Sequence, residues 1–259
     1  MHFYILGSLD VMRNDQRIRI SAPKQRAVLA ALLLNANNEV PVDRIARYVW
    51  DGHPPVTAQT TIQSYIYRLR QLLRPLPGTE LRTSTDSYLL SVDPAGIDLR
   101  HFRHLASEAR EKAELGDARG AVAGLRQAIA IWRGNALAGI PGETIRQEAR
   151  LLEGERVTAY EDLFSSELAQ GNYRQIIPEL QKAVSGYPFH EALRAQLMLA
   201  FYASGRQAEA LQQYAIIRKR LREDLGIEPG REIQDLHRAI LAQEPTTQLH
   251  TLPLFERAL

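Results

Sequence analysis

The sequence predicts a mostly α-helical fold with a small β part. Two observations support this prediction. In residues 1–96 two β-prone segments come first, three helical segments follow and a β-prone pair closes the stretch, which is the order of a winged helix-turn-helix domain. From residue 97 onward helical segments recur with a period of about 34 residues, as in an all-α tetratricopeptide-like solenoid. We therefore expect domains at 1–96 and 97–244, followed by a C-terminal tail at 245–259.

The first two helices are expected directly after two short antiparallel strands. Apolar residues alternate in HFYILGSLDV, stop at the turn-forming Asn14-Asp15 and resume in RIRI. Ser21 is then expected to cap a helix with Pro23 in its first turn, and the helix runs through KQRAVLAALLLNA. VDRIARYVW forms a second, shorter helix that Gly52 and the following prolines end.

The third helix is expected from Thr57 to Arg74, and ELRTSTDSYLLSV after it reads as a β-hairpin. Its apolar positions follow the spacing i, i+4, i+7, i+11 and form one stripe that faces the other helices: Ile62, Ile66, Leu69 and Leu73. The opposite side carries short polar groups, a tyrosine and arginines. A helix exposed only to water would more often carry Glu/Lys pairs.

Positive charge is concentrated in the first third of the chain. Residues 1–96 contain 11 Lys and Arg against 8 Asp and Glu, a net charge of +3, whereas the remaining 163 residues contain 21 against 22, a net charge of −1. No acid occurs between Asp51 and Glu80, a stretch that includes the whole third helix. This distribution is consistent with an anionic partner for the N-terminal domain.

The second domain is predicted from an internal repeat. AQGNYRQIIPELQKAVSGYP (169–188) aligns with ASGRQAEALQQYAIIRKRLR (203–222) at an offset of 34 residues, and LGDARGAVAGLRQAIAIW (115–132) is an earlier copy. Each copy has a glycine at the turn between paired helices, where we expect a Cβ to be obstructive. The segment after Pro245 has no helical period, so we expect a poorly ordered tail, in which LPLF is the one candidate for docking.

The composition argues against an enzyme and a cofactor. The 259 residues include no cysteine, which excludes disulfides and thiolate metal sites. No phosphate-binding GxxxxGK[ST] loop and no HExxH helix occurs, and His101 and His104 have no third ligand pattern beside them. No stretch approaches the roughly 18 apolar residues of a membrane-spanning helix, and the N-terminus has no signal peptide. We expect no catalytic site, no metal, no cofactor and a cytoplasmic location.

Over residues 1–244 the chain resembles the Streptomyces antibiotic regulatory proteins. The motifs that carry the resemblance are VDRIARYVWDGHPP, TIQSYIYRLRQLL, DLRHFRHLASEAR with IAIWRGNALAG, and the segment from HEALRAQLMLAFYASGRQAEAL to LGIEPG. These activators combine an OmpR-like winged-helix domain with a tetratricopeptide-type bacterial transcriptional activation domain. The chain departs from the family pattern at Ser87, where a glycine is usual, and has Asp86 before it.

The residue pattern and the resemblance together indicate a DNA-binding surface on the third helix and the hairpin. Arg68 is the best candidate for reading a base, because arginine offers a planar fork to guanine, and Arg70 and Arg74 are candidates for phosphates. Residues near the hairpin tip are candidates for backbone or minor-groove contacts. The whole set is Thr60, Thr61, Ser64, Tyr67, Arg68, Arg70, Arg74, Arg82, Thr83 and Thr85.

The resemblance further implies activation of a secondary-metabolite gene cluster. It implies binding to direct repeats in double-stranded promoter DNA and recruitment of RNA polymerase with its principal sigma factor. Two or more protomers are expected on tandem sites, as a homodimer on DNA, because a single module binds weakly at physiological salt. The alternative is a tetratricopeptide interaction scaffold that does not bind DNA.

Overall fold

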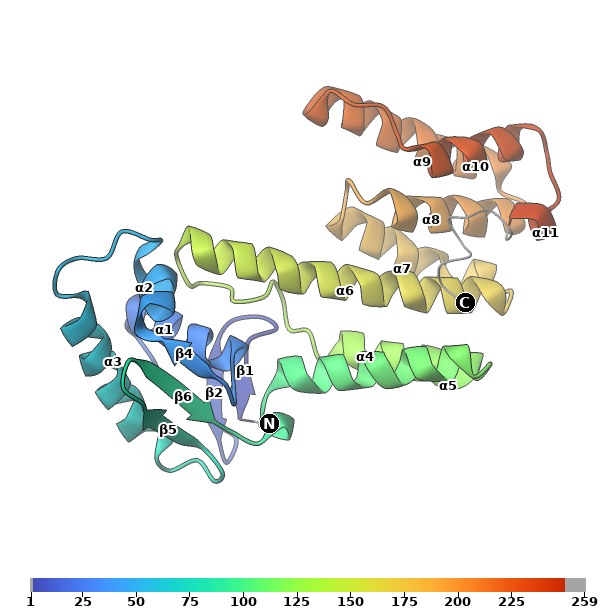
Figure 1. Cartoon of the computed structure of the whole chain (residues 1–259). Helices are drawn as coiled ribbons and strands as arrows, with labels where there is room; N and C mark the ends of the chain where they lie inside the picture. Colours follow the sequence, from blue (N-terminus) through green and yellow to red (C-terminus); the bar gives the residue numbers. More distant parts are fainter. Residues whose placement is uncertain (1, 250–259) are drawn as a thin grey trace. The chain divides into compact units, whose positions relative to one another are not determined.

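The computed structural model describes residues 2–249 (Figure 1). It contains two compact units. The first comprises the chain up to His104 together with Ala130–Glu155, and the second comprises Leu105–Ile129 together with the chain from Arg156. Each unit is therefore built from two separate stretches of the chain. The expected domain boundary after residue 96 comes from the sequence motifs and remains a prediction.

The first unit begins with a three-stranded antiparallel sheet of order β1-β2-β3. Its strands are Phe3–Tyr4, Asp10–Arg13 and Gln16–Ile18. The last two form a hairpin whose two-residue turn is Asn14-Asp15, with φ of 47° and 62°. Both values lie in the left-handed region that such a turn requires and that Asn and Asp tolerate. The expected turn is confirmed, and a third strand is added to the two that were predicted.

Three helices follow: α1 (Pro23–Leu34), α2 (Val42–Trp50) and α3 (Ala58–Leu73). Pro23 lies at the start of α1 as expected, but the N-cap residue is Ala22 and no side chain caps the helix, so the predicted capping role of Ser21 is wrong. Helix α1 is buried along nearly its whole length, and α2 and α3 pack against it. The predicted apolar stripe of α3 is confirmed, since all four of its side chains are buried.

A second antiparallel sheet, of order β4-β6-β5, closes the winged helix. The predicted hairpin is β5 (Glu80–Thr83) and β6 (Ser87–Ser91). The sequence did not indicate β4 (Glu39–Pro41), which pairs with β6. Three residues ending in proline have no strand signature of their own, and the segment is extended because β6 offers it backbone partners.

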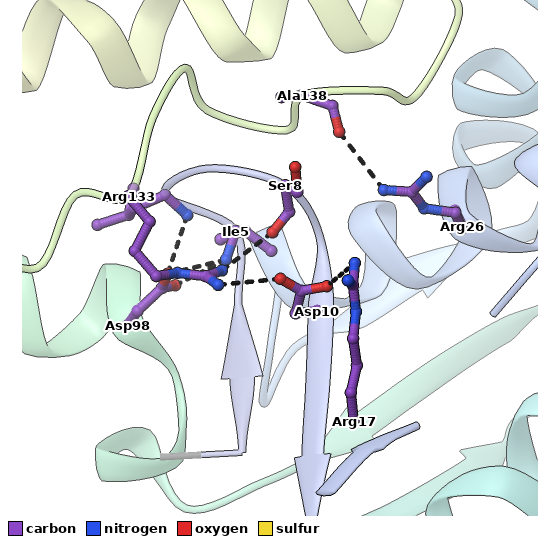
Figure 2. Close-up of polar contacts among 9 residues, drawn as sticks. Ile5, Ser8, Asp10, Arg17, Arg26, Asp98, Arg133 and Ala138 are labelled. Carbon is purple, nitrogen blue, oxygen red and sulfur yellow. Dashed lines mark hydrogen bonds and ion pairs between the residues drawn. The ribbon is translucent and has the colours of Figure 1, made fainter. Parts of the chain in front are cut away.

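The segment after Ala130 completes the first unit by lining the N-terminal sheet (Figure 2). The amides of Arg133, Leu137 and Ala138 donate to the carbonyls of Leu6, Ile5 and Gly7 at 2.8–3.0 Å. The Arg133 guanidinium donates to Asp10 at 2.9 Å. The three backbone bonds satisfy carbonyls of residues 5–7, just beyond the end of the short strand β1.

Arg26 ties α1 to the same segment. Its guanidinium reaches the carbonyls of Ala138 and Gly139 at 3.4 and 3.3 Å, as Figure 2 shows for Ala138. Residues 130–142 thereby connect the N-terminal sheet with the first helix of the winged domain.

Asp98 anchors the N-terminal strand from the first residue of α4 (Asp98–Glu114), just after the short 3-10 helix η1 (Pro94–Gly96). Its carboxylate is fully buried and accepts the amides of Ile5 and Leu6 at 2.9 Å and that of Leu99 at 2.8 Å. Burial raises the pKa of this carboxyl, and the three backbone donors oppose that rise. Asp98 thus supplies the acceptors that a neighbouring strand would otherwise provide.

The second unit is built from paired helices. They are the part of α4 after His104, α5 (Ala118–Ala130), the part of α6 (Glu143–Ala169) after Glu155, α7 (Tyr173–Gly186), α8 (Glu191–Ala203), α9 (Gln207–Arg220), the π-helix η2 (Leu221–Leu225), α10 (Arg231–Leu241) and α11 (Thr246–Leu249). Both ends of α9 lie 34 residues after the ends of α7, so the predicted repeat is confirmed. No described helix is both long and apolar enough to cross a membrane.

The glycines of the repeat are required by the backbone conformation rather than by a lack of space for a side chain. Gly116, Gly171 and Gly205 have φ of +80°, +76° and +79° at equivalent turns. A Cβ at Gly116 or Gly205 would meet nothing within 4 Å, so the expected obstruction is wrong. Glycine is favoured there because it adopts the left-handed backbone without strain.

The first residues of the expected tail are helical. Helix α11 packs against α8, and Leu249 is fully buried. The prediction of a poorly ordered tail is therefore wrong for residues 246–249, because one turn is too short to show a helical period and its position depends on burial. The remainder of the tail, with LPLF, lies outside the described residues.

Glu161 makes the stability of the second unit dependent on pH. Burial, and then the neighbouring charge of Asp162, raises the pKa of Glu161 to about 7. His190 lies 3.5 Å away but burial lowers its pKa, so it is a poor counter-ion. The pKa of Glu161 in the folded state exceeds the unfolded value of 4.5. Its contribution to the free energy of unfolding is therefore greatest below about pH 4.5 and is lost as the pH rises through about 7.

Glu161→Gln is expected to be more stable than the wild type by about 1–3 kcal/mol at about pH 8. The difference should shrink to less than about 1 kcal/mol near pH 5, where the wild-type carboxyl is protonated in the folded state. Urea denaturation at both pH values measures it. Glu111→Gln, at an exposed position of α4, is the matched control. Equal behaviour of the two variants would contradict the prediction.

Candidate nucleic-acid interface

The exposed face of α3 carries no carboxylate. Ile62, Ile66 and Leu69 point into the core, which fixes the opposite side of the helix toward solvent. The exposed residues of that side are Gln59, Thr60, Gln63, Ser64, Tyr67, Arg68, Gln71 and Arg74. Tyr67 is 63% exposed although it is a large aromatic residue. The face therefore offers hydrogen-bond donors, an aromatic ring and cations, which are groups that contact phosphates and base edges.

The hydroxyl groups of α3 bond partly to their own helix. Thr61 Oγ1 donates to the carbonyl of Thr57 at 2.8 Å, and Ser64 Oγ donates to that of Thr60 at 3.1 Å. Thr61 is half-buried, whereas Thr60 and Ser64 are exposed. Each hydroxyl oxygen keeps acceptor capacity, so Ser64 remains able to accept from a base amino group.

The three arginines of this region lie in different environments. Arg68 and Arg74 are exposed, and neither forms an ion pair within the described part of the chain. Arg70 is half-buried instead, with its Nε donating to the Leu81 carbonyl at 2.8 Å and its Nη2 to Thr83 Oγ1 at 2.7 Å. Arg70 thus joins α3 to the hairpin, a use that its spacing in the sequence does not indicate.

The hairpin brings Arg82, Thr83 and Thr85 to the surface. Arg82 pairs with Glu80 at 2.6 Å, and this contact lowers the pKa of the exposed Glu80 carboxyl. Thr83 accepts from Arg70, while Thr85 is exposed in the turn. Ser87 stands where the family usually has a glycine, at the start of β6 directly after the turn. Its Oγ donates to the carboxylate of Glu39 in β4 at 2.7 Å.

Helix α2, which precedes α3, is held by the first turns of α6. Asp51 ends α2 in the left-handed conformation, and its carboxylate accepts the Thr144 amide at 2.9 Å. Tyr48 donates to Glu148 at 2.6 Å. Burial, and then this bond, raises the pKa of Tyr48 to about 12, so the hydroxyl stays a donor. These contacts join the end of α2 to the start of α6.

Gln59 and Gln63 are candidates that sequence reasoning did not select. Both are exposed in the first half of α3. The N-terminal residues of a recognition helix contact base edges, and glutamine can bond adenine with both amide atoms. Gln63 does flank the polar face in the helical pattern of the sequence. That position does not distinguish a DNA contact from an ordinary solvent-exposed glutamine.

Comparisons with known proteins agree with this architecture. Residues 97–241 match the family model of the bacterial transcriptional activator domain, and residues 15–86 match that of the transcriptional regulatory protein, C terminal. The chain is 35% identical over 254 residues to the regulatory protein DnrI of Streptomyces peucetius, covering 95% of this chain and 93% of DnrI. The chain belongs to the Streptomyces antibiotic regulatory protein family.

Two further relatives extend this result. The transcriptional regulator RedD of Streptomyces coelicolor is 34% identical over 252 residues, which cover 95% of this chain and 71% of RedD. The solved structure of Mycobacterium tuberculosis EmbR, in complex with a low affinity phosphopeptide, superposes with a TM-score of 0.86 at 31% identity. That match covers 99% of this chain and 67% of EmbR.

Family membership makes this chain a DNA-binding transcriptional activator. The predicted fold, a winged helix followed by a helical domain, is confirmed. The reading as a scaffold without DNA binding is not favoured. The family is one of transcriptional regulators, in keeping with the prediction of a non-enzymatic protein.

Proposed function

We propose that α3 enters the major groove of promoter DNA and that the β5–β6 hairpin lies along the adjacent backbone. The observation that supports this most strongly is the exposed, acid-free face of α3, on which the Arg68 guanidinium has no partner among residues 2–249. A carboxylate on that face would repel phosphates, whereas a free arginine retains both arms for guanine O6 and N7.

The arginines divide their roles. Arg68 reads a base and Arg74 contacts a phosphate. Arg70 positions the hairpin, because its Nε and Nη2 donate to Leu81 and Thr83. Thr60, Thr61, Ser64 and Tyr67 supply further contacts along α3. Arg82, Thr83 and Thr85 supply them from the hairpin, where Arg82 must exchange Glu80 for a phosphate. Gln59 and Gln63 complete the surface.

Two protomers occupy tandem direct repeats in the promoter. One winged helix buries a small interface and makes only a few phosphate contacts, so it binds weakly at physiological salt. A second protomer on the adjacent repeat raises the overall affinity through effective concentration. The protein then acts in the cytoplasm, recruits RNA polymerase with its principal sigma factor, and activates a secondary-metabolite gene cluster.

Binding is expected to weaken steeply with salt. About four to six phosphate contacts predict a fall of about 0.9 log units in affinity per contact for each decade of salt. Arg74→Ala should reduce this slope by about one contact and weaken binding to all sequences alike. The measurement is a titration of the whole chain, between about 50 and 200 mM salt, with DNA from upstream of its neighbouring genes.

A matched titration uses the same DNA with one repeat scrambled. Loss of most of the affinity on scrambling is expected for two cooperating protomers. An absence of binding at every salt concentration would sink the DNA proposal and favour the interaction scaffold.

A further inference from the structure

A pocket of about 630 Å³ opens between α9 and α10 in the second unit. Residues of α9 and η2 line one side, and His237 of α10 lines the other. This volume lies within the range of about 300–1,000 Å³ that small-molecule sites occupy. The pocket contains none of the residues assigned to DNA binding, so its role is independent of that proposal.

Two of the residues that line the pocket are aromatic and stack on each other. The rings of Tyr214 and His237 stack with their centroids 3.9 Å apart and their planes at 13°. Leu211 and Ala215 add aliphatic surface beside them. Burial, and then the charge of Arg218, lowers the pKa of His237, which favours a neutral ring at neutral pH. A planar apolar ligand gains burial and aromatic contacts against this lining.

The rim of the pocket has an excess of cationic donors. Arg218 and Arg222 share one carboxylate, that of Glu228, at 2.8 and 3.4 Å, and each uses its Nε for that contact. The terminal amino groups of both guanidinium forks form no bond that the structure records among residues 2–249. Lys219 is only loosely paired with Glu223, at 3.9 Å. One further carboxylate would complete both arginine forks.

The backbone changes type at this rim. The chain passes from α-helix into the π-helix Leu221–Leu225, which contains Arg222. Single π-turns are rare and occur frequently at functional sites.

We propose that this pocket binds a planar aromatic acid, with its ring against Tyr214 and His237 and its carboxylate between Arg218 and Arg222. The aromatic pair favours a ligand with a planar ring. Because Arg218 and Arg222 share the single carboxylate of Glu228, both keep N–H donors for the carboxylate of the ligand. Such a site would allow a small aromatic metabolite to bind the activation domain through residues that include none of those assigned to DNA binding.

The test is calorimetric titration of the whole chain with 2-naphthoate. One site per chain is expected, and 2-naphthalenemethanol, which lacks the charge, should bind about tenfold or more weakly. Inorganic phosphate should not displace 2-naphthoate at an equal concentration. Equal binding of the neutral alcohol, or displacement by phosphate, would overturn the proposal without any variant.

Variants then locate the site. Arg218→Gln combined with Arg222→Gln should weaken 2-naphthoate about tenfold or more, and Tyr214→Leu should weaken it while leaving the charge intact. Arg238→Gln removes an exposed arginine of α10 that does not line the pocket and should leave the affinity within about twofold. Circular dichroism confirms that each variant is folded. Equal affinity in the double variant and in Arg238→Gln would refute the assignment.

Discussion

Asp98→Ala is expected to destabilise the protein by about 3–6 kcal/mol, because three backbone amides lose their acceptors in a buried site. The amides are those of Ile5, Leu6 and Leu99, and the carboxylate that serves them is inaccessible to water. A loss of this size is comparable with the whole stability of many domains, so the N-terminal sheet should detach or the first unit should unfold. Urea denaturation of the whole chain, followed by circular dichroism, measures the effect.

Asp93→Ala is the matched control for this variant. Asp93 also accepts a backbone amide, that of Ala95 at 3.0 Å, but in an exposed turn. Water replaces the lost partner there, so the expected cost is about 1 kcal/mol. Asp98→Asn keeps the shape and one good acceptor, and it should fall between the two. If Asp98→Ala and Asp93→Ala cost the same, the anchoring role of Asp98 is wrong.

Arg68→Ala is expected to remove most of the sequence preference while keeping salt-dependent binding to any DNA. One bidentate contact to guanine discriminates against the wrong base by about 1–3 kcal/mol, which corresponds to about 10–100-fold in affinity. The measurement compares the affinities for the promoter site and for a scrambled site of equal length. Their ratio should collapse in Arg68→Ala, and binding to the scrambled site should change little.

Arg13→Ala controls for the loss of one positive charge. Arg13 is exposed on β2, outside both α3 and the hairpin. Its removal should leave the ratio of the two affinities unchanged. A uniform loss of affinity in Arg68→Ala, with the ratio preserved, would reassign Arg68 to a phosphate contact.

The elements predicted most accurately are those with strong local signals. The apolar stripe of α3, the Asn14-Asp15 turn and the repeat of α7 in α9 all follow from periodicity or from residues with special backbone preferences. In each case the information lies within a few turns of the chain, where side-chain spacing determines which face is buried.

The candidate site was only partly predictable for the same reason. The exposure of Arg68 and Arg74 follows from the helical wheel of α3. The burial of Arg70 does not, because its partners, Leu81 and Thr83, belong to a strand that the wheel does not include. Whether an arginine is free for a ligand depends on which acceptors the fold brings to it, and a helix considered alone has none.

The sequence by itself determined the two architectures, the acid-free face of α3 and the family, because each rests on periodicity, composition or motif. Only the tertiary structure decided that β4 exists, that α11 is a helix and that residues 130–155 complete the first unit. These features have weak local preferences. Their conformations are stabilised by backbone hydrogen bonds and burial against residues about 50 to 130 positions away in the chain, which no local pattern encodes.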